Sequence, residues 1–565
     1  MIIEVKFEGL SGIKKGKVMK VYKEVGDTIE PNDSLFSIEE NKKTLDIEPS
    51  IKGVIKEIRI KSGDNIKIGD VLALVDGEKI ETKKSESSFD YFKGLITPKK
   101  EEIETKVTII GSGPGGYVAA IKLAQLGADV VLVEKDKVGG TCLNRGCIPT
   151  KALVRSADVF KNIKESEAYG CKVENYNLDI GQVISRKNQV ASQLGEGISY
   201  LLEKNNIKYV KGCGEILDPN TVFVKTKHRE TTIKTEYIII ATGSTTTKLP
   251  IPGIDLDNVL GSTEIMEIDE LPKEMVIIGG GVIGMEFAFI FNTFGTKISV
   301  VEYMDKLLPN LDEDICHEIE EIAENRGINI YTNSKVEEII RDENNKAIVG
   351  FTNNGEKKYI STEKVLVSIG RQPYLDGLGI EKLGLELNTN KKGIKVNEKL
   401  MTSISNIFAI GDATGGIQLA HVASAQGIVA ANNIMGIEDA MDYSIIPSAI
   451  FTDPEMASVG IDEKYAKENN IEVEIGKFPI ASNGKALTLG ASEGFVKVIV
   501  DKNSKKILGA SIIGPNATDL INEISIAMAN GLKAEDITKT IHPHPTTSES
   551  VFEALLAANG ACIHN

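Results

Sequence analysis

The run Val107-Thr108-Ile109-Ile110-Gly111-Ser112-Gly113-Pro114-Gly115-Gly116 decides the fold of most of this chain. Its β-prone start leads into a glycine-rich turn, and a helix-like pattern then precedes a second apolar strand that ends at Glu134. Gly111, Gly113 and Gly116 allow a tight turn and close approach of the backbone to a diphosphate, which the start of the helix then binds. An acid at the position of Glu134 meets a ribose hydroxyl pair. The pattern predicts a Rossmann-like dinucleotide-binding fold.

A second copy of this pattern begins at Met275. Its strand and turn read Met275-Val276-Ile277-Ile278-Gly279-Gly280-Gly281-Val282-Ile283-Gly284, with fingerprint glycines at Gly279, Gly281 and Gly284. The next strand ends at Glu302. A carboxylate there hydrogen-bonds the 2′-hydroxyl of NAD and repels the 2′-phosphate of NADP. The second fold is therefore predicted to bind NAD.

Two cysteines follow the first fold, in the run Gly139-Gly140-Thr141-Cys142-Leu143-Asn144-Arg145-Gly146-Cys147-Ile148-Pro149-Thr150-Lys151. On a regular α-helix, Cys142 and Cys147 would be separated by a rise of about 7.5 Å, beyond the roughly 7 Å Cα limit for a disulfide. A disulfide between them requires a distorted helix start, which Gly146 or Pro149 could supply. Such a pair is typical of labile redox disulfides. Two ordinary loop thiols are the alternative.

Two dinucleotide folds beside a cysteine pair suggest an electron relay, and here the chain resembles the flavin-dependent pyridine nucleotide–disulfide oxidoreductases. The resemblance covers about Lys106 to Ala558 and is greatest to members that oxidise dihydrolipoyl groups with NAD+. Three further motifs carry it: Ile240-Ala241-Thr242-Gly243-Ser244, Ala409-Ile410-Gly411-Asp412-Ala413 and Phe451-Thr452-Asp453-Pro454-Glu455-Met456-Ala457-Ser458-Val459-Gly460.

The resemblance assigns roles to several residues. FAD would occupy the first fold and NAD the second, with Thr242, Gly243, Gly411 and Asp412 completing the FAD site. Cys142 would exchange with the substrate dithiol, and Cys147 would lie next to the flavin. Lys151 would approach the flavin ring, paired with Glu286. Arg145 lies between the two cysteines, where many relatives have an apolar residue. Its charge could lower the pKa of a thiol, or, as we favour, its side chain could point to solvent.

A general base is expected near the C-terminus, because a thiol at neutral pH is mostly protonated while the thiolate is the nucleophile. The segment His542-Pro543-His544-Pro545-Thr546-Thr547-Ser548-Glu549 fits the family's histidine–glutamate pair. By resemblance, His544 is the base, Glu549 orients it, and His542 is a structural neighbour. The family supplies this base from the partner subunit, which implies a homodimer. In isolation, the segment would read as a proline-rich turn.

Residues 1–76 contain an internal repeat. Gly26-Asp27-Thr28-Ile29 recurs as Gly63-Asp64-Asn65-Ile66, an offset of 63 − 26 = 37, and the flanking runs are short and β-rich. The duplication predicts an all-β sandwich that resembles a lipoyl or biotinyl carrier domain. Aligned with that family, Lys42 is the acceptor lysine for covalent lipoyl, and the absence of Met-Lys-Met disfavours biotin. Asn41 and Lys43 depart from the usual pattern, and an unmodified sandwich is the alternative.

These assignments give a multidomain chain with an all-β module, two α/β nucleotide folds and a C-terminal α+β lobe. The expected parts are a lipoyl domain (1–76), a flexible linker (77–105), an FAD-binding domain (106–250), an NAD-binding domain (251–374), a central domain completing the FAD site (375–444) and an interface domain (445–565). The linker assignment rests on its charged, serine-bearing composition.

The bulk composition excludes several classes. A formal charge of −16 over 565 residues argues against nucleic acid as a partner. No apolar stretch is long enough to span a bilayer, and Met1-Ile2-Ile3-Glu4 begins no secretory signal. The remaining cysteines show no pairing pattern, which indicates a cytoplasmic protein with one catalytic disulfide, and no metal-ligand spacing occurs.

The sequence as a whole favours an enzyme that oxidises a dihydrolipoyl group, on its own or another carrier domain, with NAD+. It would serve a 2-oxo acid dehydrogenase, acetoin or glycine-cleavage complex. Reduction of glutathione or mercuric ion is a second interpretation, disfavoured by Glu302 and by the single cysteine near the C-terminus, Cys562. A third interpretation is that the chain acts chiefly as a carrier and scaffold. The catalytic motifs argue against this as its sole role.

Overall fold

The computed structural model describes residues 2–7, 15–29, 34–40, 43–47, 51–79, 98–226, 228–389 and 392–564. The chain divides into two compact units, Met1–Ile96 and Thr97–Asn565. Within the described residues, no helix has the length and apolar character that crossing a membrane requires.

The N-terminal unit is a sandwich of two four-stranded sheets, as the repeat predicted. Buried aliphatic side chains such as Val18, Leu35 and Leu72 fill the space between them. The first sheet has the order β1 (Ile2–Lys6), β8 (Val71–Lys79), β6 (Ile51–Ile58), β3 (Thr28–Ile29), and the second has β5 (Lys43–Ile47), β4 (Phe36–Glu40), β2 (Lys15–Val21), β7 (Asn65–Lys67).

The two halves of this unit complete each other's turns. Gly26 N–H donates to Ile55 O and Gly63 N–H donates to Val18 O, both at 2.8 Å. In return, the aspartate after each glycine accepts from the N–H of the same partner residue, at 3.0 and 2.8 Å. The two copies of the 37-residue repeat therefore make matching bonds to each other, as two halves related by an approximate twofold axis do.

The hairpin of β4 and β5 brings Glu40 opposite Lys43. Lys42, the expected acceptor, belongs to the chain between these strands and lies outside the described residues.

The first nucleotide fold is built on a sheet of order β11 (Lys208–Lys211), β10 (Val130–Glu134), β9 (Lys99–Ile110), β14 (Arg229–Ile240), β13 (Thr221–Lys225), β12 (Cys213–Asp218). Strands β9, β10, β11 and β14 are parallel, and β25 (Ile407–Ala409) adds to β14 from much later in the chain. Helix α1 (Pro114–Gln125) packs closely on α8 (Ala420–Ile434), since a Cβ on Gly427 would lie 2.6 Å from Gly115 O.

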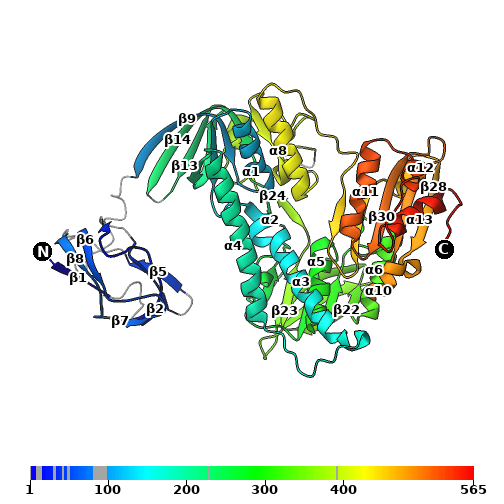
Figure 1. Ribbon diagram of the computed structural model, residues 1–565, viewed down its shortest axis with the longest axis horizontal. Coiled ribbons are helices and arrows are strands. Elements are labelled where there is room, and N and C mark those ends of the chain that lie inside the picture. The colour runs from blue at the N-terminus through cyan, green and yellow to red at the C-terminus, as the bar shows by residue number, and fades with distance from the viewer. Residues whose placement is uncertain are drawn as a thin grey trace. The chain divides into compact units, whose positions relative to one another are not determined.

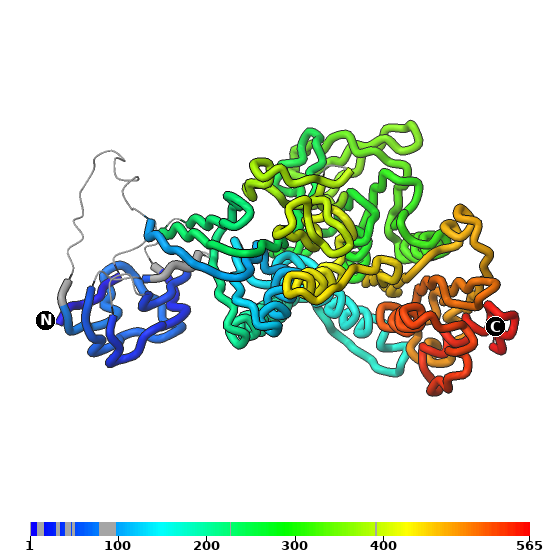
Figure 2. The backbone as a smooth tube through the Cα atoms, turned by 90° about the horizontal axis from the view of Figure 1, so that it is seen from above, coloured from blue at the N-terminus to red at the C-terminus, as the bar shows by residue number. Residues whose placement is uncertain are grey.

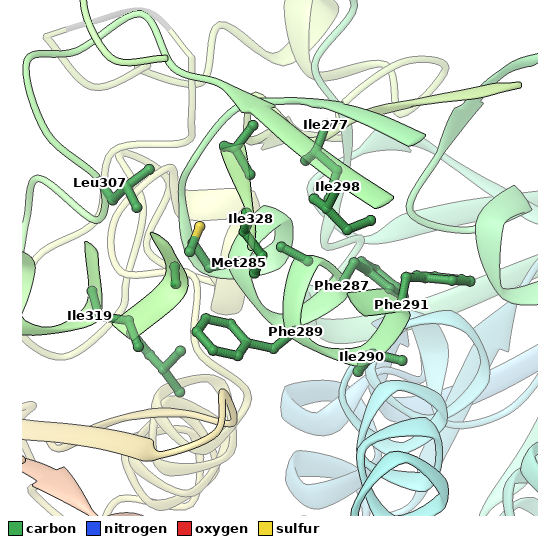
Figure 3. Close-up of a cluster of buried hydrophobic side chains, with 14 of the residues drawn as sticks. Ile277, Met285, Phe287, Phe289, Ile290, Phe291, Ile298, Leu307, Ile319 and Ile328 are labelled. Carbon is green, nitrogen blue, oxygen red and sulfur yellow. The ribbon is translucent and has the colours of Figure 1, made fainter. Parts of the chain in front are cut away.

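The second nucleotide fold repeats this plan around a five-stranded parallel sheet. Its order is β16 (Val259–Gly261), β23 (Lys364–Val367), β17 (Glu274–Ile278), β18 (Lys297–Val301), β19 (Asn329–Tyr331), and a meander of β20 (Ser334–Arg341), β21 (Ala347–Asn353) and β22 (Glu356–Thr362) follows. Helix α5 (Val282–Phe294) carries a nearly continuous set of buried side chains, and Figure 3 shows how its phenylalanines fill the core beside this sheet.

The C-terminal lobe is an antiparallel sheet covered by helices. The sheet order is β26 (Ser448–Ile450), β27 (Glu455–Gly460), β30 (Ile507–Gly514), β29 (Phe495–Asp501), β28 (Val473–Pro479), with α11 (Ala517–Ala529) and α13 (Glu549–Ala558) packed on it. Figure 2 shows these residues, orange to red, gathered into one lobe of the unit.

The structure shortens the predicted linker at both ends. Strand β8 continues to Lys79, and β9 begins at Lys99 and pairs with β14 along its whole length. The charged start of β9 resembles a linker in composition, but Ile103 is buried while its charged neighbours face outward. A strand with one solvated face keeps such a composition.

Candidate active site

Both glycine loops have the shape of a diphosphate cradle. At Gly111 (φ +108°) and Gly279 (φ +106°), an added Cβ would lie 2.2 Å from Ala241 O and 2.7 Å from Ser368 O, respectively. At Gly113 and Gly281, the residues just before α1 and α5, a Cβ would meet nothing within 4 Å.

Neither helix start is capped by a side chain. Open space in front of an uncapped helix start leaves backbone N–H groups available to an anion, so both loops fit the diphosphate of a dinucleotide.

The two acids that follow these loops occupy equivalent positions. Glu134 Oε2 accepts from Ser112 N–H at 2.9 Å, and its other oxygen accepts from Asp136 N–H at 2.8 Å. Glu302 makes the same two bonds in the second fold, at 2.5 and 2.7 Å. Both carboxylates are buried, at 8% and 7% exposure. The glycine loop and the acid are therefore locked together in each fold.

The cysteine run forms two helices with a break between them. Cys142 lies in α2 (Gly140–Arg145), and Cys147 begins α3 (Cys147–Lys164). Gly146 separates the helices with φ −145° and ψ −117°, and a Cβ there would lie 3.3 Å from Cys142 Cα. This break is the distortion that the sequence required for the two sulfur atoms to meet.

The run also packs directly on the first glycine loop. Gly139 N–H donates to Ser112 O at 3.0 Å, and a Cβ on Gly140 would lie 2.7 Å from Gly113 Cα. The cysteines are thereby fixed next to the loop predicted to hold FAD.

The two half-buried thiols have opposite acidities. The hydrogen bond from the Cys142 thiol, aided by the cation of Lys151, lowers the pKa of Cys147 to about 7. That same bond and burial raise the pKa of Cys142. In the reduced pair, Cys147 is therefore the thiol that ionises first and Cys142 the protonated donor, and the thiolate is the reactive form.

Lys151 links three parts of the unit near this pair. Its Nζ lies 2.9 and 3.0 Å from the carboxylate oxygens of Glu286 on α5, and 4.4 Å from the ring centroid of Phe451. Phe451 N–H in turn donates to Glu286 Oε1 at 3.0 Å. Both nucleotide folds and the start of the C-terminal lobe therefore converge on one buried carboxylate.

A second network surrounds Asp412. Ser244 Oγ donates to Asp412 Oδ2 at 2.5 Å, while Arg371 donates to Ser244 Oγ and Ser244 O, both at 2.7 Å. Thr242 Oγ1 is buried and has no hydrogen-bond partner among the described residues. An orphaned hydroxyl beside this network fits a bound polar group, which supports the predicted FAD site.

Sequence reasoning missed Arg371. It begins the short strand β24 (Arg371–Pro373), just beyond the end of β23 at Val367, and burial lowers the pKa of its guanidinium. An isolated arginine after an apolar strand was the only sequence signal for it. Arg145 does not simply point to solvent: it donates to Asp136 Oδ2 and is about one third exposed.

The histidine segment forms the expected pair, but apart from the cysteines. His544 Nδ1 bonds to Glu549 Oε1 at 2.9 Å, and Thr546 N–H donates to Glu549 Oε2 at 2.8 Å. The His544 side chain is 78% exposed, and no contact joins it to either cysteine within the described part of the chain. Figure 1 shows α13, which Glu549 begins, in the C-terminal lobe and α2 in the body.

Comparison with known families matches nearly the whole chain. The model described as Pyridine nucleotide-disulphide oxidoreductase matches residues 105–427, and that family's dimerisation domain matches residues 446–555. The model described as Biotin-requiring enzyme, a biotin/lipoyl domain, matches residues 10–75.

Individual relatives are similar over the same region. A dihydrolipoyl dehydrogenase of Bacillus subtilis is 42% identical to this chain, and the match covers 82% of this chain and 99% of the relative. A mitochondrial dihydrolipoyl dehydrogenase of Pisum sativum is 40% identical, and the match covers 82% of this chain and 93% of the relative. Among solved structures, the Cu(II) complex of the HOCl-induced flavoprotein disulfide reductase RclA of Escherichia coli has a TM-score of 0.73 at 31% identity, covering 80% of this chain and 99% of that one. LpdA of Mycobacterium tuberculosis has a TM-score of 0.75 at 25% identity, with the same coverage.

Proposed function

Because the chain belongs to the pyridine nucleotide-disulphide oxidoreductase family, we propose that it oxidises dihydrolipoyl groups with NAD+, as a dihydrolipoyl dehydrogenase. The overall reaction is dihydrolipoyl + NAD+ → lipoyl + NADH + H+. The observation that carries the proposal is the cysteine pair of opposite acidity, set against the first glycine loop in a chain 42% identical to a named dihydrolipoyl dehydrogenase.

Thiol–disulfide exchange accounts for the asymmetry of the pair. His544 takes the proton of one substrate thiol, and the resulting thiolate attacks Cys142 Sγ of the disulfide. Cys147 leaves as a thiolate, and a lower thiol pKa makes a faster leaving group. The second substrate thiol then attacks the mixed disulfide, which releases the lipoyl ring and leaves a proton on Cys142.

FAD, when bound, supplies the two-electron step between this dithiol and NAD+. Gly111, Gly113, Gly116 and Glu134 would hold its diphosphate and ribose, and Asp412 and Thr242 would complete the site. Gly279, Gly281, Gly284 and Glu302 would hold NAD in the second fold, where the buried carboxylate disfavours a 2′-phosphate.

The separation of His544 from the cysteines supports a homodimer. Within the described part of one chain no contact joins the base to the cysteines, so a second copy would supply it, consistent with the match to a dimerisation domain. Light scattering of the purified protein should give twice the chain mass.

The N-terminal unit carries covalent lipoyl on Lys42, and the β4–β5 hairpin supports this assignment. Intact mass after expression with lipoate should show one lipoyl group, which Lys42→Arg prevents and Lys43→Arg does not. Such an arm would serve the other enzymes of a 2-oxo acid dehydrogenase, acetoin or glycine-cleavage complex, in the cytoplasm.

The decisive experiment mixes the holoenzyme with free dihydrolipoamide and either NAD+ or NADP+. Fast reduction of NAD+ alone is expected, and Cys142→Ser should abolish it. Cys171→Ser, at an exposed cysteine, should not change it. A protein that holds FAD but turns over neither nucleotide would refute the proposal.

A further inference from the structure

The short segment that opens the C-terminal lobe is tied to the body at both of its ends. It runs between β26 and β27 and includes Phe451, Thr452 and Asp453. The N–H and the ring of Phe451 contact the Lys151–Glu286 pair at one end. Asp453, at the other end, makes a separate set of ion pairs, which no step of the proposed reaction uses.

Asp453 accepts hydrogen bonds from two cations that belong to different parts of the body. Its Oδ2 accepts from Lys161 Nζ, on α3, and from Arg326, directly after α6 (Glu313–Asn325), both at 2.6 Å. Arg326 also donates to the Asp453 carbonyl, so it holds the backbone of the segment as well as the side chain. The Lys161 and Arg326 side chains are only 32% and 21% exposed. Ion pairs partly shielded from water are stronger than those on an open surface.

Helix α3 is therefore held by this segment at two points. Lys151 and Lys161 are 161 − 151 = 10 residues apart on α3, a rise of about 15 Å. The first lies against the Phe451 ring, and the second pairs with Asp453, two residues further along the segment. Between these points, Phe451 and Asp453 line one small hollow together with side chains of α3 and α5, which lie side by side in Figure 1. A displacement of Asp453 is thus passed to Lys151 through both the segment and the helix.

Two further acids lie near Asp453, and neither takes over its bonds. Glu455 Oε2 already accepts from the N–H and the hydroxyl of Thr518, at 3.1 and 2.8 Å. Burial, together with the charges of Asp453 and Glu455, raises the pKa of Asp158, which makes it the poorer partner for a cation. Asp453 is therefore the residue through which the two cations hold the segment.

We propose that Asp453 is a positioning residue, which holds Phe451 in place against Lys151 and thereby fixes the cation beside the redox cysteines. The consequence for turnover rests on the proposed function, whereas the effect on the cysteine pair does not. The same lobe carries His544. In the homodimer, one lobe would thus steady the cation of its own cysteine pair and supply the base to the pair of its partner.

Asp453→Asn tests this role, because it removes the charge and keeps the size of the side chain. In the reduced, full-length holoenzyme, we expect the thiolate fraction of Cys147 at pH 7 to fall roughly two- to fivefold, since the pKa of Cys147 rises from about 7 once Lys151 is no longer fixed. Cys142, Lys151 and Glu286, the charged or bonding groups that act on this thiol, are all unchanged in the variant. The pH dependence of iodoacetamide alkylation, followed at Cys147 by peptide mass spectrometry, measures the thiolate fraction.

Glu493→Gln is the matched control. It removes the other carboxylate partner of Arg326, at 2.5 Å, and leaves the segment itself unchanged. We expect its alkylation profile to be that of the wild type. Dihydrolipoamide oxidation should fall roughly 10-fold in Asp453→Asn and less than about twofold in the control, since misplacing a catalytic group by about 1 Å costs up to about 100-fold. A wild-type alkylation profile in Asp453→Asn, or an equal shift in both variants, would overturn the proposal.

A second variant covers the case in which Asp453→Asn fails to fold. Lys161→Met leaves Asp453 bound to Arg326 but frees α3 from this end of the segment, so the alkylation profile of Cys147 should shift in the same direction. An unshifted profile there would also overturn the positioning role. A shifted profile in Asp453→Asn, found with a wild-type protein that does not oxidise dihydrolipoamide, would refute the proposed function and leave the positioning role intact.

Discussion

Lys151 and Glu286 lie on two different nucleotide-binding folds, and Lys151 Nζ is within 3.0 Å of both carboxylate oxygens of Glu286. Glu286 is only 5% exposed, so its charge depends on this lysine and on Phe451 N–H. The pair holds α3, which begins at Cys147, against α5 of the second fold. A change at either residue is therefore felt at Cys147.

Replacing Lys151 with methionine should raise the pKa of Cys147. After the hydrogen bond from Cys142, the Lys151 cation is the main group holding that pKa at about 7, and its loss leaves Glu286 as an unbalanced negative charge. The thiolate fraction at pH 7 should fall several-fold. The pH dependence of iodoacetamide alkylation in the reduced protein measures it, with Lys164→Met, at the end of the same helix, as a control that should leave the profile unchanged.

Two substitutions of Cys142 should separate hydrogen bonding from redox chemistry. Both Cys142→Ser and Cys142→Ala remove the disulfide and should abolish dithiol oxidation. Only alanine removes the donor to Cys147, so the pKa of Cys147 should rise from about 7 in Cys142→Ala and stay near it in Cys142→Ser. Thiolate absorbance against pH distinguishes the two variants. Identical titrations would contradict the role given to the Cys142 thiol.

Loss of the base should affect only the thiol half of the reaction. His544→Gln should lower dihydrolipoamide oxidation by about 10²–10⁴-fold, the usual contribution of a positioned base. NADH oxidation by an artificial acceptor does not need this proton transfer and should change less than twofold. His564→Gln, which alters an exposed histidine bonded to Glu553, is the matched control. An equal loss in both assays would show that the substitution disrupts the fold.

A buried lysine should account for much of the stability of the contact between the second fold and the C-terminal lobe. Lys497 is 3% exposed and lies 2.8 Å from Asp312, itself 2% exposed, and 2.7 Å from Glu463. Lys497→Met leaves Asp312 buried without its cation and should cost about 3–5 kcal/mol. Guanidinium unfolding measures this loss. The exposed Lys477 pairs with Asp314, and Lys477→Met should cost below about 1 kcal/mol.

The sequence predicted the parts of the fold whose determinants are local. Each glycine loop and its acid are 22 residues apart and bonded through the backbone, so a short pattern contains the whole unit. The duplicated sandwich was predictable for a similar reason, because the repeat itself appears in the residue order. The spacing of the cysteines predicted a distorted helix start at Gly146 or Pro149 if the two pair, and the break lies at Gly146.

Features that depend on distant partners were not predictable. The charged start of β9 resembles a linker until it is paired with β14, and Arg371 matters only because Ser244 and Asp412 approach it. The bond from His542 to Glu523 likewise requires a residue 19 positions earlier, on α11. The catalytic roles of Cys142, Cys147, His544 and Glu549 remain predictions from resemblance and geometry.

The reciprocal turns of the N-terminal unit make it, in effect, a dimer whose two subunits were joined in one chain. Gly26 and Gly63 each donate to a strand of the opposite half, so a single 37-residue half would leave its own turn unsatisfied. We therefore expect the two halves to melt together. The N-terminal unit should open as a single cooperative body.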